Sequence, residues 1–158
     1  MLRVVSGGQT GVDRGALDGA LACGAPCGGW CPAGRIAEDG VIQERYPLRA
    51  LMDGGYEDRT RKNVEDSDAT LVISFGQPEG GTALTIDYCR EIGKPCLLID
   101  ALQYSPSEAA GRAIPFIDRH DIINLNVAGP RASSEPDAYG FAKETITFLL
   151  KGSQDGES

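Results

Sequence analysis

The sequence predicts an α/β fold in which a mostly parallel sheet of about five strands carries helices on both faces. Short apolar runs, typical of strands, alternate along the chain with segments of helical periodicity. Glycine or proline stands between successive segments, which marks the turns. Strands and helices that alternate through short links form parallel sheets with the helices packed outside.

The first strand is expected at residues 2–6 and the first helix at residues 11–22, where apolar side chains recur at helical spacing. Thr10 precedes this helix and is expected to cap it. Gly15 and Gly19 lower helix propensity, so we expect them at positions of close packing against the sheet.

A short second strand is expected at residues 26–30. The following residues, 32–55, form the least regular part of the chain, with charges, several glycines and Pro47. Connections of this length inside a compact domain are usually functional or disordered. The segment is therefore a candidate functional loop.

The second half of the chain alternates more regularly. Helices are expected at residues 59–67, 81–92, 105–120 and 137–150, and strands at residues 69–75, 96–100 and 122–127. Ser105 or Ser107 lies near the start of the third of these helices, and Pro115 is expected to kink or end it. Residues 1–151 are thus expected to form a single ligand-binding domain, and residues 152–158 a polar tail that frays.

Composition narrows the class of partner. The 158 residues carry a formal charge of −8, which argues against nucleic acid or an anionic membrane surface. No apolar run approaches the length of a membrane span, and the N-terminus lacks the apolar core of a signal peptide. We therefore expect a cytoplasmic protein.

The five cysteines include a run at Cys23, Cys27 and Cys31. Its spacing differs from the Cys-x2-Cys pairs of zinc sites, and the intervening glycines and proline prevent a helix from aligning the thiols. The prediction is no metal site and free thiols that pack as small hydrophobic residues.

Two glycine-rich loops follow predicted strands and open helices. The first is SGGQTGVDRG at residues 6–15, and the second is GQPEGGTALT at residues 76–85. Helix N-termini expose unpaired N–H groups that favour anions, so both loops are candidates for a phosphate site at one edge of the sheet. The alternative is that the glycines serve turn geometry alone. The first loop matches neither the Walker A nor the dinucleotide fingerprint.

Charged residues in or near these loops are further candidates. Asp13 and Arg14 could contact a ligand hydroxyl and an anion, or Asp13 could simply complement the helix dipole. After the last strand, Arg131 and Ser133 precede another helix, where Ser133 or Ser134 could instead be a cap. In the irregular segment, Arg35, Glu38 and Asp39 lie near Trp30, which could stack on a ligand ring or pack in the core. No G-x-S-x-G elbow occurs, which argues against triad hydrolysis.

These motifs together resemble the molybdenum-cofactor carrier family. The resemblance rests on SGGQTGVDRGALDGA at residues 6–20, GWCPAGRIAEDG at 29–40, the segment from Arg59 and Thr60 through Asn63 to Asp68, GGTALT at 80–85 and NVAGPRAS at 126–133. It implies a Rossmann-like fold related to the cytokinin-activating phosphoribohydrolases. It also implies a cargo, molybdenum cofactor, which is a pterin with a dithiolene and a terminal phosphate, and it implies a homo-oligomer.

The resemblance also bears on catalysis. In the related phosphoribohydrolases a glutamate follows the P-G-G-x-G-T motif, and this position is Thr85 here. A threonine cannot act as that carboxylate, so a binding protein is favoured over an enzyme. The alternatives are a nucleotide-binding sensor and a phosphoribohydrolase-like enzyme in which Glu38, Asp39 or Asp87 replaces the missing glutamate.

The expected site therefore has three kinds of residue. Backbone and hydroxyl contacts to phosphate come from Gly7, Gly8, Gln9, Thr10, Gly11, Gly80, Gly81 and Thr82. Charge partners are Arg14, Arg35, Arg59 and Arg131, which would form a cationic pocket inside an acidic protein. Other ligand contacts are expected from Asp13, Glu38, Asp39, Thr60, Asn63, Asn126 and Ser133, and the Cys31 thiolate could face the molybdenum.

Overall fold

A five-stranded sheet with the order β2-β1-β9-β7-β8 forms the centre of the protein, and every neighbouring pair in it is parallel. The computed structural model describes residues 1–157. The strands of the sheet are β1 (Arg3–Val5), β2 (Cys27–Gly28), β7 (Ala69–Ser74), β8 (Cys96–Asp100) and β9 (Asn124–Ala128). The predicted α/β fold with a parallel sheet of five strands is confirmed.

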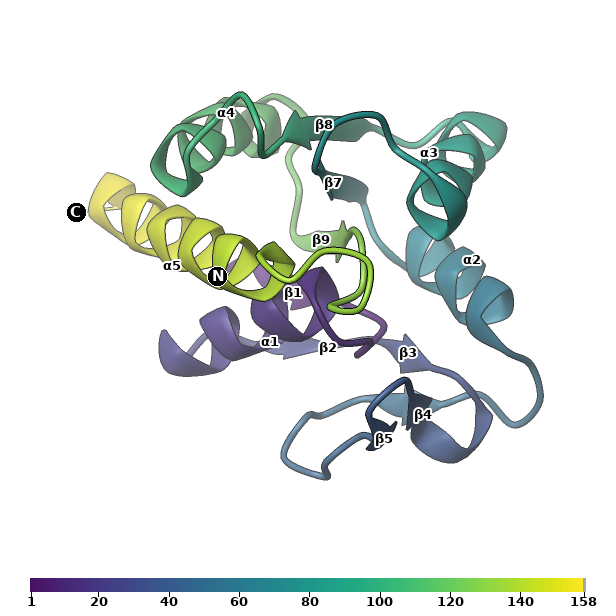
Figure 1. Cartoon of the computed structure of the whole chain (residues 1–158). Helices are drawn as coiled ribbons and strands as arrows, with labels where there is room; N and C mark the ends of the chain where they lie inside the picture. Colours follow the sequence, from purple (N-terminus) through teal and green to yellow (C-terminus); the bar gives the residue numbers. More distant parts are fainter. Residues whose placement is uncertain (158) are drawn as a thin grey trace.

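Helices cover both faces of the sheet (Figure 1). Their bounds are α1 (Val12–Ala22), α2 (Tyr56–Asp66), α3 (Gly80–Ile92), α4 (Pro106–Arg119) and α5 (Ala138–Glu157). α5 packs between α1 and α4 on one face, and α2 packs against α3 on the other. The result is the three-layer, Rossmann-like architecture.

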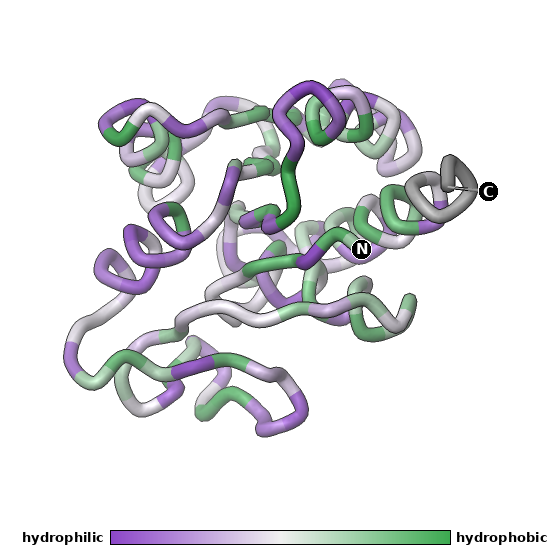
Figure 2. Tube along the Cα trace, turned by 180° about the vertical axis from the view of Figure 1, so that it is seen from behind, coloured by the Kyte–Doolittle hydropathy of each residue, from purple (hydrophilic) through white to green (hydrophobic). Residues whose placement is uncertain are grey.

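Hydrophobic residues run through the central strands of the sheet (Figure 2), and helices on its faces complete the main core. All six residues of β7 are buried, as its continuous apolar sequence predicts for a strand covered on both faces. The edge strand β8 is less protected, and Leu98 is 44% exposed.

The irregular segment between β2 and α2 folds as a small appendage beside α1. It contains β3 (Trp30–Cys31) paired with β6 (Arg49–Ala50), the 3-10 turn η1 (Ala33–Arg35), and β4 (Ile36–Ala37) paired with β5 (Gly40–Val41). We call residues 32–55 the appendage loop. Its apolar side chains form a second small core with Leu17 of α1 and Cys31 of β3; the loop contributes Ala37, Ile42, Tyr46 and Leu48.

The prediction of a single strand at residues 26–30 is wrong, because the chain passes there from the central sheet, as β2, into the small sheet that contains β3. Gly29 has φ +137°, and a Cβ at this position would lie 2.2 Å from the Ser6 carbonyl oxygen. The chain therefore turns away from the central sheet at Gly29, and only β2 stays paired with β1.

Two expectations for the first helix are also wrong. Thr10 does not cap α1, whose N-cap is Gly11; the Thr10 hydroxyl instead accepts a hydrogen bond from the Ala132 N–H at 3.1 Å. Gly15 and Gly19 do allow close packing, but against α5 rather than the sheet. A Cβ on Gly15 would lie 2.4 Å from the Tyr139 carbonyl oxygen.

Of the two C-terminal helices, α4 has the predicted bounds and one of the two expected caps, whereas α5 is longer than predicted. Ser105 caps α4 and forms a capping box with Glu108, and α4 continues through Pro115 to Arg119. α5 continues past the predicted end at residue 150 as far as Glu157, and Ser158 lies outside the described residues. None of the helices in the described chain is long and apolar enough to span a bilayer.

Candidate functional site

A cavity of about 490 Å³ lies beyond the carboxyl ends of β1, β7 and β9, and we call it the carboxyl-edge cavity. Its volume falls in the usual range for small-molecule sites, about 300–1,000 Å³. Both glycine-rich loops reach it. Its lining includes Gln9 and Asp13, then Tyr56, Glu57, Arg59 and Thr60 of α2, Ser74, Phe75, residues 77–82, Leu84, Thr85, residues 128–131, Ser134 and Glu135.

In the first glycine-rich loop, the glycines serve close packing of the protein itself. A Cβ on Gly7 would lie 1.9 Å from Nη1 of Arg59, and one on Gly8 would lie 2.4 Å from Leu48. Gly11 has φ +81°, and a Cβ there would lie 2.4 Å from the Pro130 carbonyl oxygen. None of these three glycines lines the cavity, so they favour the alternative in which glycine is needed for turn geometry.

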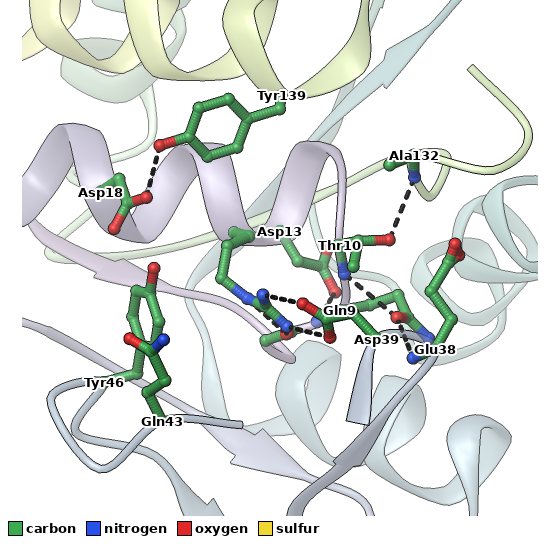
Figure 3. A network of polar contacts seen from close by, with 12 residues as sticks. Gln9, Thr10, Asp13, Asp18, Glu38, Asp39, Gln43, Tyr46, Ala132 and Tyr139 are labelled. Carbon is green, nitrogen blue, oxygen red and sulfur yellow. Dashed lines mark hydrogen bonds and ion pairs between the residues drawn. The ribbon is translucent and has the colours of Figure 1, made fainter. Parts of the chain in front are cut away.

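Gln9 and Asp13 are the residues of this loop that do line the cavity, and Gln9 is only 5% exposed. Its Oε1 accepts hydrogen bonds from the N–H groups of Thr10, at 3.0 Å, and Glu38, at 2.9 Å. Figure 3 shows the amide held between these two neighbours. Its Nε2 has no partner among the described residues.

Asp13 and Arg59 form an ion pair in the cavity wall. Nη1 of Arg59 donates to Oδ2 of Asp13 at 3.0 Å, and the Gln9 N–H donates to the same oxygen at 3.3 Å. Burial raises the pKa of Asp13 above its usual value, although Arg59, the Gln9 N–H and Arg14 all act to lower it. Asp13 is therefore a buried carboxyl beside a guanidinium at the edge of a ligand-sized space.

The N-terminus of α3 forms the part of the wall most open to an anion. Nothing lies within 4 Å of a Cβ built on Gly80 or Gly81. The N–H groups of these two residues donate to no acceptor in the described chain, as expected for the first turn of a helix. The Thr85 hydroxyl donates to the Gly81 carbonyl oxygen at 2.9 Å.

Arg131 completes this side of the cavity, with its guanidinium carbon 5.2 Å from the centre of the Tyr56 ring. It forms no ion pair with the described residues. Four carboxylates nevertheless line the same space, namely Asp13, Glu57, Glu79 and Glu135. The prediction of a cationic pocket is wrong, because the cavity is lined by two arginines, Arg59 and Arg131, and by four acidic residues.

Arg14 does not line the carboxyl-edge cavity; it lines a separate, shallower hollow together with Thr10, Asp18, Tyr46 and Tyr139. Its guanidinium forms a two-bond pair with Asp39, at 2.8 and 3.1 Å, and also donates to the Gly8 carbonyl oxygen. This hydrogen-bonded pair lowers the pKa of Asp39 and raises that of Arg14. Both residues therefore join α1 to the appendage loop rather than face the cavity.

Arg35 and Glu38 are also used within the protein. The Arg35 guanidinium donates to four carbonyl oxygens of the appendage loop, those of Ile42, Gln43, Tyr46 and Leu48. Glu38 accepts hydrogen bonds from the N–H and hydroxyl of Ser133, at 3.2 and 2.9 Å. None of these three residues, Arg35, Glu38 and Ser133, lines the cavity.

Two predicted amide contacts are structural as well. Asn63 is 1% exposed, and its side chain bonds both the N–H and the carbonyl oxygen of Trp30, which fixes α2 to β3. Asn126 donates to the Thr70 hydroxyl between neighbouring strands at 3.3 Å. Trp30 itself donates to Asp66 at 2.7 Å and packs near Lys62 and Arg49, so it does not line the cavity.

The cysteine run contributes no ligand to the cavity. Cys31 is fully buried in the small core of the appendage loop, and this burial raises the pKa of its thiol. All five cysteines are free. No cluster of three or more metal-ligating side chains occurs in residues 1–157.

The structure thus brings eight predicted site residues to one cavity and places the others elsewhere. The eight are Gln9, Asp13, Arg59, Thr60, Gly80, Gly81, Thr82 and Arg131. Sequence reasoning missed Ser74 and Tyr56. Ser74 ends a strand, so the rule that ligands bind at strand ends could have found it, whereas nothing in the sequence pattern singles out Tyr56.

Comparisons with known proteins agree with this architecture. A crystal structure of a protein named "Putative molybdenum carrier protein" from Syntrophus aciditrophicus SB is 43% identical, with a TM-score of 0.92 and 95% of each chain covered. Among curated proteins, no match was found. The model of the circularly permutated YpsA SLOG family matches residues 4–150. This chain belongs to the circularly permutated YpsA SLOG family.

Proposed function

We propose that this protein is a cytoplasmic carrier that holds molybdenum cofactor as cargo in the carboxyl-edge cavity. The observation that carries the proposal is the 43% identity, over 95% of both chains, to a protein named as a molybdenum carrier. The cavity supports it independently, because its volume suits a pterin-sized ligand and its wall combines a helix N-terminus with aromatic and polar side chains.

The phosphate of the cargo would bind at the N-terminus of α3. The N–H groups of Gly80 and Gly81 are unpaired and unobstructed there, and Thr82 adds a hydroxyl. Arg131 is the one cavity arginine without a carboxylate partner among the described residues, so it is the natural charge partner for the phosphate. The ring of the cargo would then extend toward Tyr56 and the wall formed by Gln9, Asp13 and Arg59.

Cofactor retention tests this proposal. The protein is isolated from a host that makes the cofactor, the bound pterin is oxidised, and its fluorescence is measured. We expect pterin in proportion to protein, and at least about a tenfold loss in Arg131→Ala, because a charge-assisted hydrogen bond contributes about 1.5–3 kcal/mol. The matched control is Arg49→Ala, at an exposed arginine outside the cavity. Wild-type protein with no more pterin than an unrelated protein from the same host would overturn the proposal.

A second candidate function is processing of a nucleotide, and the Asp13–Arg59 pair favours it. Glu38 and Asp39 bond elsewhere and Asp87 does not line the cavity, so none of them can replace the missing glutamate. Asp13, with its raised pKa, remains as an acid or base within the cavity. Release of free base from nucleoside monophosphates, lost in Asp13→Asn, would identify this activity. Binding without release would indicate a nucleotide sensor.

A further inference from the structure

Three polar side chains in the cavity wall have an atom that is sealed from solvent and has no hydrogen-bond partner in the described residues. These atoms are Nε2 of Gln9, Oγ of Ser74 and Nε of Arg59. All three residues line the carboxyl-edge cavity, and Gln9 and Ser74 are 5% and 2% exposed. Each atom can donate a hydrogen bond. Buried donors without acceptors are rare because each costs free energy, so their gathering at one cavity indicates a ligand.

The orientation of the Gln9 amide is fixed by its neighbours. Its Oε1 accepts from two backbone N–H groups, and a flipped amide would place N–H against N–H at both contacts. Nε2 is therefore the amide atom left without a partner, and it can only donate. Arg59 also presents only donors, so two of the three groups can bind nothing but an acceptor.

One acceptor lies in the same wall. Oδ2 of Asp13 accepts from Arg59 and from the Gln9 N–H, while Oδ1 accepts from no described residue and is not among the atoms sealed from solvent. The wall therefore offers several donors beside one available carboxylate oxygen.

We propose that this wall recognises the lactam edge of a heterocycle, in which a ring carbonyl stands beside a ring N–H. The carbonyl oxygen accepts from Gln9 and Ser74, and the ring N–H donates to Oδ1 of Asp13. A ring that carries an amino group in place of the carbonyl directs a donor at the donors of the wall and is rejected. The proposal rests on the proposed function in that the ring is the cargo's pterin, but it does not depend on the metal or the phosphate.

A matched pair of ring compounds tests the proposal. Binding of 6-hydroxymethylpterin and of 2,4-diamino-6-hydroxymethylpteridine to the full-length protein is measured by fluorescence titration at neutral pH. We expect the pterin to bind at least about tenfold more tightly, because the wrong ring leaves buried polar groups unpaired. Equal or tighter binding of the diamino compound, or no binding of the pterin, would overturn the proposal.

Variants identify the residues responsible. Gln9→Glu keeps the oxygen that accepts from Thr10 and Glu38 but replaces the Nε2 donor with an acceptor, so the preference should disappear. Ser74→Ala removes one donor without a change in packing and should reduce the preference several-fold, even if the Gln9 variant folds poorly. Ser133→Ala, at a serine outside the cavity, should leave the preference unchanged.

An unchanged preference in both Gln9→Glu and Ser74→Ala would contradict the assignment. The outcome is also separable from the proposed function. If the pterin preference is found but the isolated protein retains no cofactor, the carrier proposal fails and the lactam site stands. If cofactor is retained but the two rings bind equally, the carrier proposal stands and the lactam site fails.

Discussion

The appendage loop and the carboxyl-edge cavity both contain buried or half-buried polar side chains, but they use them in opposite ways. In the appendage loop, Arg35 donates to four carbonyl oxygens, and Asp39 is paired with Arg14. In the cavity wall, donors of Gln9 and Ser74 have no partner among residues 1–157. Buried polar groups with hydrogen-bond partners stabilise the fold. Buried polar groups without partners lower the free energy of unfolding, but they remain available to bind a ligand.

The comparison shows which feature marks a ligand site in this protein. An arginine in an irregular loop is a poor marker, because the fold itself can satisfy its guanidinium with backbone carbonyls, as it does for Arg35. A better marker is a buried hydrogen-bond donor that has no partner in the described part of the protein and belongs to a residue lining a cavity. This criterion separates Arg35 from Arg59, two residues that the sequence alone does not distinguish.

The largest expected effect is at Arg35. Arg35→Ala removes hydrogen bonds to four carbonyl oxygens and should lower the free energy of unfolding by about 3 kcal/mol, at roughly 0.5–1.5 kcal/mol per bond. Urea unfolding measures this. Arg49→Ala, on the exposed strand β6 of the same segment, loses only a contact with the Trp30 ring and should change stability by no more than about 1 kcal/mol. Equal effects of the two substitutions would show that the Arg35 bonds do not hold the loop.

A smaller effect separates two buried hydroxyls on β7. Thr70 bonds Asn126, whereas Ser74 has no partner in the described chain. Thr70→Val should lower the free energy of unfolding by about 1–2 kcal/mol, because it leaves the Asn126 amide unpaired. Ser74→Ala should leave it unchanged or raise it by up to about 1 kcal/mol. A loss in Ser74→Ala as large as in Thr70→Val would mean that Ser74 has a structural partner.

The smallest expected effect is a difference in pH dependence between two carboxylates. The Arg14 hydrogen bond lowers the pKa of Asp39, so its contribution to stability is present above pH about 4 and is lost as pH falls through the folded-state pKa. Burial raises the pKa of Asp13, so its contribution is present below pH about 4 and is lost as pH rises through the folded-state pKa.

The corresponding variants should therefore move in opposite directions. Relative to wild type, Asp39→Asn should be least stable near neutral pH and approach wild type in acid. Asp13→Asn should gain relative stability as pH rises. Urea unfolding between pH 3 and pH 8 measures both curves. Parallel curves would contradict the assignment of one carboxylate to the loop and the other to the cavity wall.

The order and type of the main elements could be predicted from the sequence, because each strand and helix carries its own periodicity. The strand predicted at residues 96–100 matches β8, and that at residues 69–75 matches β7 within one residue. The site could be predicted only in part. Topology places Gly80 and Gly81 at a strand end, but the partners of Arg14 and Arg35 are set by tertiary contacts that no local pattern encodes.

The most direct measurement is the native mass spectrum of the protein as isolated from a host that makes molybdenum cofactor, compared with Gly81→Leu. A Cβ on Gly81 meets no atom within 4 Å, so the larger side chain should leave the fold intact and fill the end of the cavity next to the N-terminus of α3. The account predicts an added mass equal to the cofactor on the wild-type protein and none on the variant. A wild-type protein without bound cofactor, or a variant that retains it equally, would contradict the account.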